Sequence, residues 1–292
     1  MIKYSTILLL VIISSIGIFS VKSEILVKEN NHFDNEINTK KSVKCYPSPE
    51  NRIMQSFYVD FHRKITWLTY DNNKRDHQLI EKYDNKKNII EKQEYYKKFS
   101  IGHLDGIYVE SDTIFTTDKW TNPSIIKIKN KNLIGRLQYP IEIIGNQVLA
   151  VDRQNTEKFI VWATEKESGN KKIFTGKFDS KKEKILSFKK SKIIFPKDEV
   201  LQGIALNNNK VYVLTGLSPP YSFLYIWNME NGILIKRIPL ESKIKKYKDI
   251  YKYEPEGLNI ISDDNGEKII LIGIAVITKT KKHFNCIIPF SN

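Results

Sequence analysis

Short runs of alternating apolar and polar residues recur along most of the chain. Residues 56–61 alternate in this way and lead through a turn to residues 65–69, and the run 211–214 is rich in β-branched and aromatic residues. Such runs favour strands, and turns containing Asn and Gly separate them. Periodicity of 3.6 residues is absent apart from a short helix near residues 243–250, so the pattern predicts an all-β protein. The strongly charged segment 71–98 predicts an exposed hairpin.

One pattern repeats along the chain. It consists of a polar residue that is usually followed by a Gly, then an alternating strand, a tight turn and a second strand. The copies start at Gln55, Asp105, Gln202 and Glu256, and a weaker copy covers residues 140–151. Gln55 and Asp105 stand 50 positions apart, and Gln202 and Glu256 stand 54 apart. Repeats of about 40–50 residues made of strands are typical of β-propellers, in which each unit is one four-stranded blade. The sequence therefore predicts a five-bladed β-propeller; a β-sandwich with similar hairpins is the alternative.

The first residues have the layout of a secretory signal peptide. Lys3 supplies a positive start, residues 6–19 form a mainly apolar run without charge, and small or branched residues precede Glu24. The run is shorter than the roughly 20 residues that span a bilayer, which disfavours the alternative of an uncleaved anchor helix. We therefore expect a secreted, extracellular protein without a transmembrane span after cleavage. Its predicted parts are a signal peptide (1–23), a polar leader (24–44) and a single propeller domain (45–292).

Composition and charge narrow the class of protein. Hydrophobic residues make up 41% and charged residues 27% of the chain, which excludes collagen-like, disordered and multi-span membrane proteins. The formal net charge of +14 attracts polyanions such as nucleic acid, anionic lipid or acidic wall polymers. An AT-rich genome, which favours Lys and Asn codons, explains the same charge. Because net charge bears on association rather than on specific recognition, we expect no specific nucleic-acid partner.

The chain has two cysteines, Cys45 near the start of the predicted domain and Cys286 near its end. Two thiols in an oxidising compartment usually pair. A Cys45–Cys286 disulfide bond would join the first and last strands of the ring and stabilise the fold by about 5 kcal/mol on the chain-entropy model. Two separate buried thiols are the alternative. The absence of a CxxC motif disfavours a redox or zinc site.

The repeated polar residues suggest one shared site. Innermost propeller strands begin at one mouth of a central channel, so these side chains converge there, the default place for a ligand. Alternation also puts His103 and Asp105 on one face, and Glu254 and Glu256 on another. Trp120, in a turn, is predicted to stack on a sugar ring. The predicted ligand-binding residues of this channel mouth are Gln55, His103, Asp105, Gln202, Glu254 and Glu256.

Several uses of this set are compatible with the residue types. Carboxylates and amide oxygens hold Ca²⁺ in other proteins, and Glu254 and Glu256 are the metal candidates here. His103 with a carboxylate suits acid–base hydrolysis. The same groups hydrogen-bond a sugar, or they only satisfy exposed backbone groups and water. The motifs HExxH, GxSxG, GxGxxG and the P-loop are absent, so we predict no catalytic residues and no cofactor, with Ca²⁺ as the one exception considered.

Two motifs resemble a known family. Leu201-Gln202-Gly203-Ile204-Ala205-Leu206, followed some fifty residues later by Glu254-Pro255-Glu256-Gly257-Leu258, resembles the C-terminal half of helveticin J-like class III bacteriocins. The pairing is also similar to teichoic-acid-biosynthesis-C-like proteins and to receptor-binding propellers of phage tails, and Gly102-His103 followed by Gly106-Ile107 resembles a blade start of that group. The resemblance covers about residues 53–285. It implies a five-bladed propeller with carbohydrate-binding or bacteriocin-like activity, marks Gln202, Glu254, Glu256 and His103 as mouth residues, and brings no catalytic residues.

These observations lead to one main hypothesis and two alternatives. The main hypothesis is a secreted, monomeric propeller that binds an extracellular, anionic glycan or cell-wall polymer through its channel mouth. Basic surface residues would raise the encounter rate with such a polymer. The alternatives are a Ca²⁺-dependent propeller hydrolase of the lactonase or esterase type, and a protein-interaction scaffold in which the mouth has no role.

Overall fold

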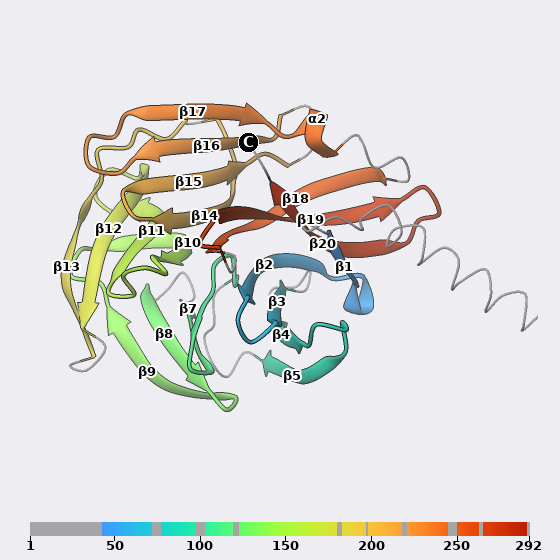
Figure 1. Cartoon of the computed structure of the whole chain (residues 1–292). Helices are drawn as coiled ribbons and strands as arrows, with labels where there is room; N and C mark the ends of the chain where they lie inside the picture. The colour runs from blue at the N-terminus through green and yellow to red at the C-terminus, as the bar shows by residue number, and fades with distance from the viewer. Residues whose placement is uncertain are drawn as a thin grey trace, which may run out of the picture. The chain divides into compact units, whose positions relative to one another are not determined.

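The residues that the structure describes form five four-stranded antiparallel sheets around a common centre, which is a five-bladed β-propeller (Figure 1). This confirms the predicted all-β, five-bladed fold. The predicted signal peptide (1–23) and nearly all of the predicted leader (24–44) lie outside the described residues, and no described helix has the length and apolar character needed to cross a membrane. The structure is a computed structural model and describes residues 43–71, 77–96, 103–118, 123–179, 183–196, 198–217, 221–244, 250–262 and 265–290.

Each blade has four strands in order from the channel outward. The innermost strands are β2 (Ile53–Asp60), β6 (Tyr108–Glu110), β10 (Ile143–Val151), β14 (Leu201–Asn207) and β18 (Ile250–Ser262). The second strands are β3 (Ile65–Asp71), β7 (Thr113–Thr117), β11 (Lys158–Glu165), β15 (Lys210–Thr215) and β19 (Lys268–Thr278). The third strands are β4 (His77–Tyr83), β8 (Ser124–Lys129), β12 (Lys171–Asp179), β16 (Phe223–Asn228) and β20 (His283–Phe290). The outermost strands are β5 (Ile89–Tyr96), β9 (Asn132–Gln138), β13 (Lys184–Lys190), β17 (Leu234–Pro239) and β1 (Lys44–Pro47).

Within the described ranges, two short helices accompany the strands. The 3-10 helix η1 (Pro49–Asn51) joins β1 to β2, and α2 (Glu241–Ile244) follows β17. The helix predicted near residues 243–250 overlaps α2 at its start, and residues 245–249 lie outside the described part. Both helices connect one blade to the next, so they leave the blade order unchanged.

The start of the chain completes the last blade. Strand β1 is the outermost strand of the fifth blade and pairs with β20, with Cys45 directly opposite Cys286. The two cysteines form a disulfide across a sequence separation of 241 residues, which confirms the predicted pairing. Because a cross-link over so long a loop removes much entropy from the unfolded chain, it contributes about 5 kcal/mol on the chain-entropy model. Residues Lys44–Asn292 form one compact unit.

Apolar side chains fill the spaces between neighbouring blades. Strand residues alternate in direction, so a blade covered on both sides buries apolar residues from both of its faces. Between the third and fourth blades, the Phe195 ring lies with its centroid 6.4 Å from those of Trp162 and Trp227. On the other face of the third blade, Phe174 and Phe188 stack with their centroids 5.1 Å apart. Aromatic rings thus fill space on both faces of the third blade.

Glycines stand where neighbouring innermost strands touch. A Cβ at Gly106 would lie 2.7 Å from the Leu149 amide nitrogen, and one at Gly203 would lie 2.8 Å from the Gly257 carbonyl carbon. A Cβ at Gly257 would lie 2.9 Å from the Ser56 Cα, and the φ of this residue is +87°, a region that other residues rarely adopt. The glycines of the repeat therefore allow close approach of adjacent backbones at the blade starts.

Two parts of the chain differ from the sequence-based expectation. The weaker repeat copy at 140–151 was predicted as two strands, but its residues from 143 on form the single strand β10, which has a register irregularity between Ile144 and Val148. Extra residues at a bulge break the alternation, so the pattern reads as two strands. The charged segment 71–98 does form a hairpin, but β4 and β5 are the outer half of the first blade, and Leu79 and Ile80 are buried.

Candidate functional site

Four of the five innermost strands, all except β6, share an irregularity near their first residues. The β2 ladder skips Gln55 and the β14 ladder skips Gln202. The β18 ladder skips Glu256 together with Gly257, and the β10 ladder skips residues 145–147. A bulge leaves a residue outside the strand pairing and changes the direction of its side chain. Gln55, Gln202 and Glu256 are therefore bulge residues, whereas Asp105 lies before β6, outside the strand pairing.

Every blade has one polar residue at the corresponding place, two positions before a residue that lines the channel. The residues two positions further on all line the central channel, and they are Phe57, Ile107, Leu149, Ile204 and Leu258. The corresponding polar residues, which we call the bulge ring, are Gln55, Asp105, Gln147, Gln202 and Glu256.

Gln147 is the member that sequence reasoning missed. It is 3% exposed, and among the described residues neither of its side-chain amide atoms has a hydrogen-bond partner. Its backbone oxygen accepts a hydrogen bond of 3.1 Å from the Thr117 hydroxyl, which ties the second blade to the third. The sequence did contain a signal for Gln147. It stands two positions before Leu149, just as Gln202 stands two positions before Ile204. This correspondence was missed because the weaker repeat copy at 140–151 was interpreted as two strands.

The structure brings several of the predicted mouth residues together. The Gln202 side chain donates a hydrogen bond of 3.3 Å to the Glu254 carboxylate. Glu256 interacts electrostatically with both Glu254 and Asp105, so carboxyl groups from the second and fifth blades share one region. Gln55 is different, because it is buried and its amide bonds only to the nearby Ile53 carbonyl, at 3.2 Å.

Burial sets the protonation of the two glutamates. Burial raises the pKa of Glu256 well above its usual range, and the negative charges of Glu254 and Asp105 raise it further. Burial also raises the pKa of Glu254, while the hydrogen bond from Gln202 and the charge of Lys252 lower it. The Glu256 carboxyl group therefore favours its neutral form, which both donates and accepts a hydrogen bond.

His103 lies between two carboxylates. Its Nδ1 contacts an oxygen of Asp105, and its Nε2 lies 3.1 Å from an oxygen of Asp71 at the end of β3. Ionised carboxylates only accept hydrogen bonds, so both ring nitrogens face groups that favour a proton on them. The imidazole then joins the first blade to the loop before β6, and it has no free nitrogen to act as a general base. This geometry disfavours the acid–base role considered for His103.

The channel itself is narrow. The innermost strands of all five blades line a cavity of about 30 Å³, and one water needs about 10–15 Å³ by the same measure. Asp105 is the only one of the six predicted site residues that lines this cavity; the other side chains along it are mostly apolar. A sugar ring does not fit inside, so a ligand of that size binds at a mouth.

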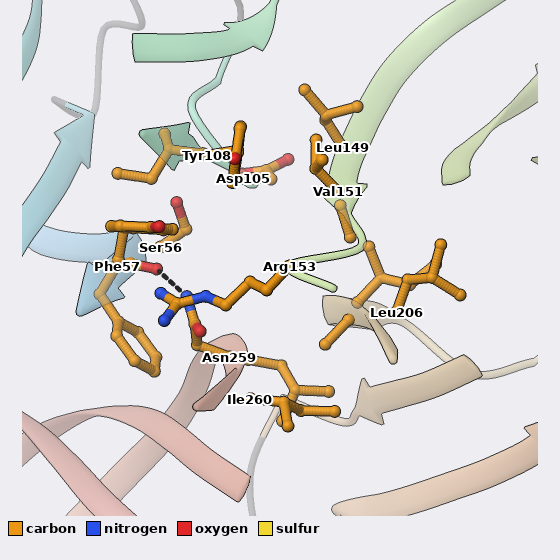
Figure 2. A pocket seen from close by; sticks show the side chains of 17 residues that line it. Ser56, Phe57, Asp105, Tyr108, Leu149, Val151, Arg153, Leu206, Asn259 and Ile260 are labelled. Atoms are coloured by element: carbon orange, nitrogen blue, oxygen red, sulfur yellow. Dashed lines mark hydrogen bonds between the residues drawn. The ribbon is translucent and has the colours of Figure 1, made fainter. Parts of the chain in front are cut away.

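Arg153 obstructs the channel at the end opposite the strand starts. Figure 2 shows its side chain extending across the pocket toward Phe57 and Asn259. The guanidinium lies 4.1 Å from the centre of the Tyr58 ring and donates a hydrogen bond to the Val59 carbonyl. A residue of the third blade thus contacts the end of the first blade across the channel.

Exposed aromatic side chains stand at the side of the ring where the innermost strands begin. Tyr251, the second residue of β18, is 76% exposed, and Tyr221, just before β16, is 73% exposed. Strand β15 runs opposite to β14, so the loop that holds Tyr221 lies at the end where β14 begins. Trp120, which was predicted to stack on a sugar, lies outside the described residues. Within the described ranges, no group of three or more His, Cys, Asp or Glu residues could hold a metal ion.

Comparisons with known proteins support the fold. No family model and no curated protein matches the chain. Among solved structures, the tail fibre of Staphylococcus aureus phage P68 is similar with a TM-score of 0.58 and 14% identity, over 91% of this chain and 56% of that one. The Neurospora crassa Pan2 WD40 domain is similar with a TM-score of 0.42 and 8% identity, over 85% of this chain and 72% of that one. The chain thus spans little more than half of the tail fibre, and at 14% identity the likeness to the tail fibre shows the fold alone.

Proposed function

We propose that this protein binds an extracellular glycan or cell-wall polymer at the mouth where its innermost strands begin. The observation that supports the proposal most strongly is the convergence of partly exposed polar groups from different blades at this mouth. Gln202 of the fourth blade bonds to Glu254 of the fifth, and the His103–Asp105 pair comes from the loop that opens the second blade. Propellers host many functions, so the case rests on these residues and not on the fold.

The groups at this mouth suit sugar hydroxyls. A hydroxyl both donates and accepts hydrogen bonds, the carboxylates accept them, and the Gln202 amide does both. Tyr221 and Tyr251 offer exposed aromatic faces, on which the apolar face of a sugar ring packs. Asp105 and Glu254 repel phosphate or carboxylate groups at this place. The unit bound at the mouth is therefore a neutral sugar, and any anionic group of the polymer contacts another surface.

The extracellular location is part of the proposal. A structural disulfide is typical of exported proteins, and Cys45–Cys286 is such a bond. The helveticin J-like resemblance extends the proposal to growth inhibition of a target bacterium. The hydrolase alternative has less support, because both ring nitrogens of His103 contact carboxylates.

A binding screen with matched variants tests this proposal. The purified mature chain is applied to an array of wall glycopolymers and neutral glycans, with and without Ca²⁺, and the affinity for the best ligand is then measured for Gln202→Ala and Glu254→Gln. Gln202→Ala loses a neutral hydrogen bond to the sugar, and Glu254→Gln loses a charge-assisted one. We therefore expect the affinity of each variant to fall about tenfold or more.

Gln154→Ala is the control, because Gln154 is exposed at the opposite mouth, and its affinity should equal that of the wild type. Circular dichroism and thermal melting verify that the three variants fold. Wild-type affinity in both mouth variants would refute the proposal, and so would an equal loss in the control.

A further inference from the structure

The third blade is the most basic part of the propeller. Residues 143–196 hold twelve Lys or Arg and six Asp or Glu, so this segment supplies +6 of the formal net charge of +14. The strands β11, β12 and β13 form the outer part of this blade (Figure 1). An excess of positive charge often reflects only a solvated surface. Whether these lysines could form a binding surface depends on their positions on the sheet.

Three of these lysines share one face of the sheet. Lys158 of β11 is directly opposite Lys177 of β12, and Lys189 of β13 is directly opposite Thr175. Register partners point to the same side, and so do residues two positions apart, such as Thr175 and Lys177. We call Lys158, Lys177 and Lys189 the lysine face. Lys177 and Lys189 are exposed and Lys158 is half-buried.

None of the described carboxylates forms an ion pair with a lysine of the lysine face. Among the described residues, no carboxylate oxygen lies within 4.0 Å of the ammonium groups of Lys158, Lys177 or Lys189. Neighbouring lysines of the same blade do have such partners, because Lys190 pairs with Glu165 and Lys166 lies 2.9 Å from Glu142. The three face lysines are thus close in space and have no ion-pair partner in the part of the chain that the structure describes.

This arrangement has a cost that a bound anion would remove. Directly opposite residues of an antiparallel pair have Cβ atoms about 4.5–5.5 Å apart, and like charges there are destabilising. Lys177 and Lys189 are diagonal neighbours, about 7–8 Å apart. An anion that offers oxygens to two or three ammonium groups at once relieves this repulsion, and a phosphate group has that geometry.

We propose that the lysine face binds the repeating phosphate groups of a phosphodiester-linked glycopolymer. The inference rests on the proposed function for the sugar part of this ligand. The phosphate part stands on the lysine face alone. Lys158 directly follows the turn at the end of β10, so the lysine face and the mouth with its carboxyl groups are two separate surfaces of the propeller.

The test uses inorganic polyphosphate, which has the anionic repeat and no sugar. Its affinity is measured by fluorescence polarisation at several salt concentrations for the wild type and for the triple variant Lys158→Gln, Lys177→Gln and Lys189→Gln. We expect the variant to bind at least tenfold more weakly at 0.15 M salt. Its slope of log K against log salt concentration should shrink by about 2, because each phosphate contact contributes roughly 0.7–0.9.

The matched control removes three exposed lysines from other blades by Lys129→Gln, Lys210→Gln and Lys279→Gln. It carries the same change in net charge, so it should lose less than twofold in affinity. An equal loss in both triple variants would overturn the inference, because net charge would then explain binding. Unchanged binding in the first variant would overturn it as well.

Two further measurements separate this inference from the proposed function. Gln202→Ala should bind polyphosphate like the wild type, and the lysine-face variant should bind a neutral glycan ligand like the wild type. If polyphosphate binding depends on the lysine face and no glycan binds the mouth, only the proposed function fails. Tighter binding of a single-stranded DNA of equal charge than of a phosphodiester-linked glycopolymer would overturn the choice of ligand.

Discussion

The Glu256 carboxyl group gives the most quantitative prediction. Glu256 is 6% exposed, and burial together with Glu254 and Asp105 raises its pKa well above the ordinary value of 4.5. Replacing it by Gln keeps the shape and a hydrogen-bond donor but removes the titration. The variant Glu256→Gln should therefore differ from the wild type in how its stability depends on pH.

The sign follows from proton binding. Above pH 4.5 the unfolded chain loses this proton, while the folded chain retains it until its own raised pKa is passed. Over that window the folded state binds more protons, so the free energy of unfolding of the wild type falls as pH rises. For one group the fall approaches about 1.4 kcal/mol per pH unit. The variant lacks this loss, so its advantage over the wild type grows as pH rises through this window, by at most about 1.4 kcal/mol per pH unit.

Urea unfolding at pH 4, 5, 6 and 7 measures the difference between the two proteins. The exposed Glu142, whose side chain is 78% exposed, supplies the control variant Glu142→Gln, which should show no such trend. Other titrating groups occur in both proteins and cancel in the difference. A stability difference that is constant across pH, or a variant that becomes relatively less stable as pH rises, would refute the reasoning about burial.

Two further predictions concern the ring itself. Cys45→Ser with Cys286→Ser should lower the free energy of unfolding by about 5 kcal/mol through lost loop-closure entropy, and a urea titration that shows a loss under 1 kcal/mol would contradict this account of the bridge. Gly106→Ala should cost about 1–3 kcal/mol, because its Cβ would lie 2.7 Å from the Leu149 nitrogen. In the same assay Gly135→Ala should change stability little, because its nearest neighbour is the flexible Lys127 side chain at 3.5 Å, and equal effects of the two substitutions would exclude crowding as the cause.

The repeat predicted the fold because its spacing reflects a backbone requirement. Gln202 and Glu256 each precede a Gly, and the structure shows why, since these glycines touch the next innermost strand. The disulfide followed from the same ring, because its two cysteines fall in the first and last strands. Features that recur once per blade are therefore visible in a single sequence.

Features that depend on contacts between blades were not visible. Gln147 was missed because bulge residues break the alternation that marks a strand. Arg153 reaches across the channel to the first blade, and Asp71 meets His103 from another strand. Lys158 and Lys177 face each other only once the strand register is known. No local pattern encodes these distances.

Hydrogen exchange followed by mass spectrometry tests the central claim, that the mouth at the strand starts binds the glycan. The chain is compared with and without its best glycan ligand from the array. We predict slower exchange in peptides that contain residues 103–105, 202–203 and 254–257, and no change in the turns at 152–157 and 207–210 at the opposite mouth. Protection of the opposite mouth, or of the outer strands alone, would contradict the account.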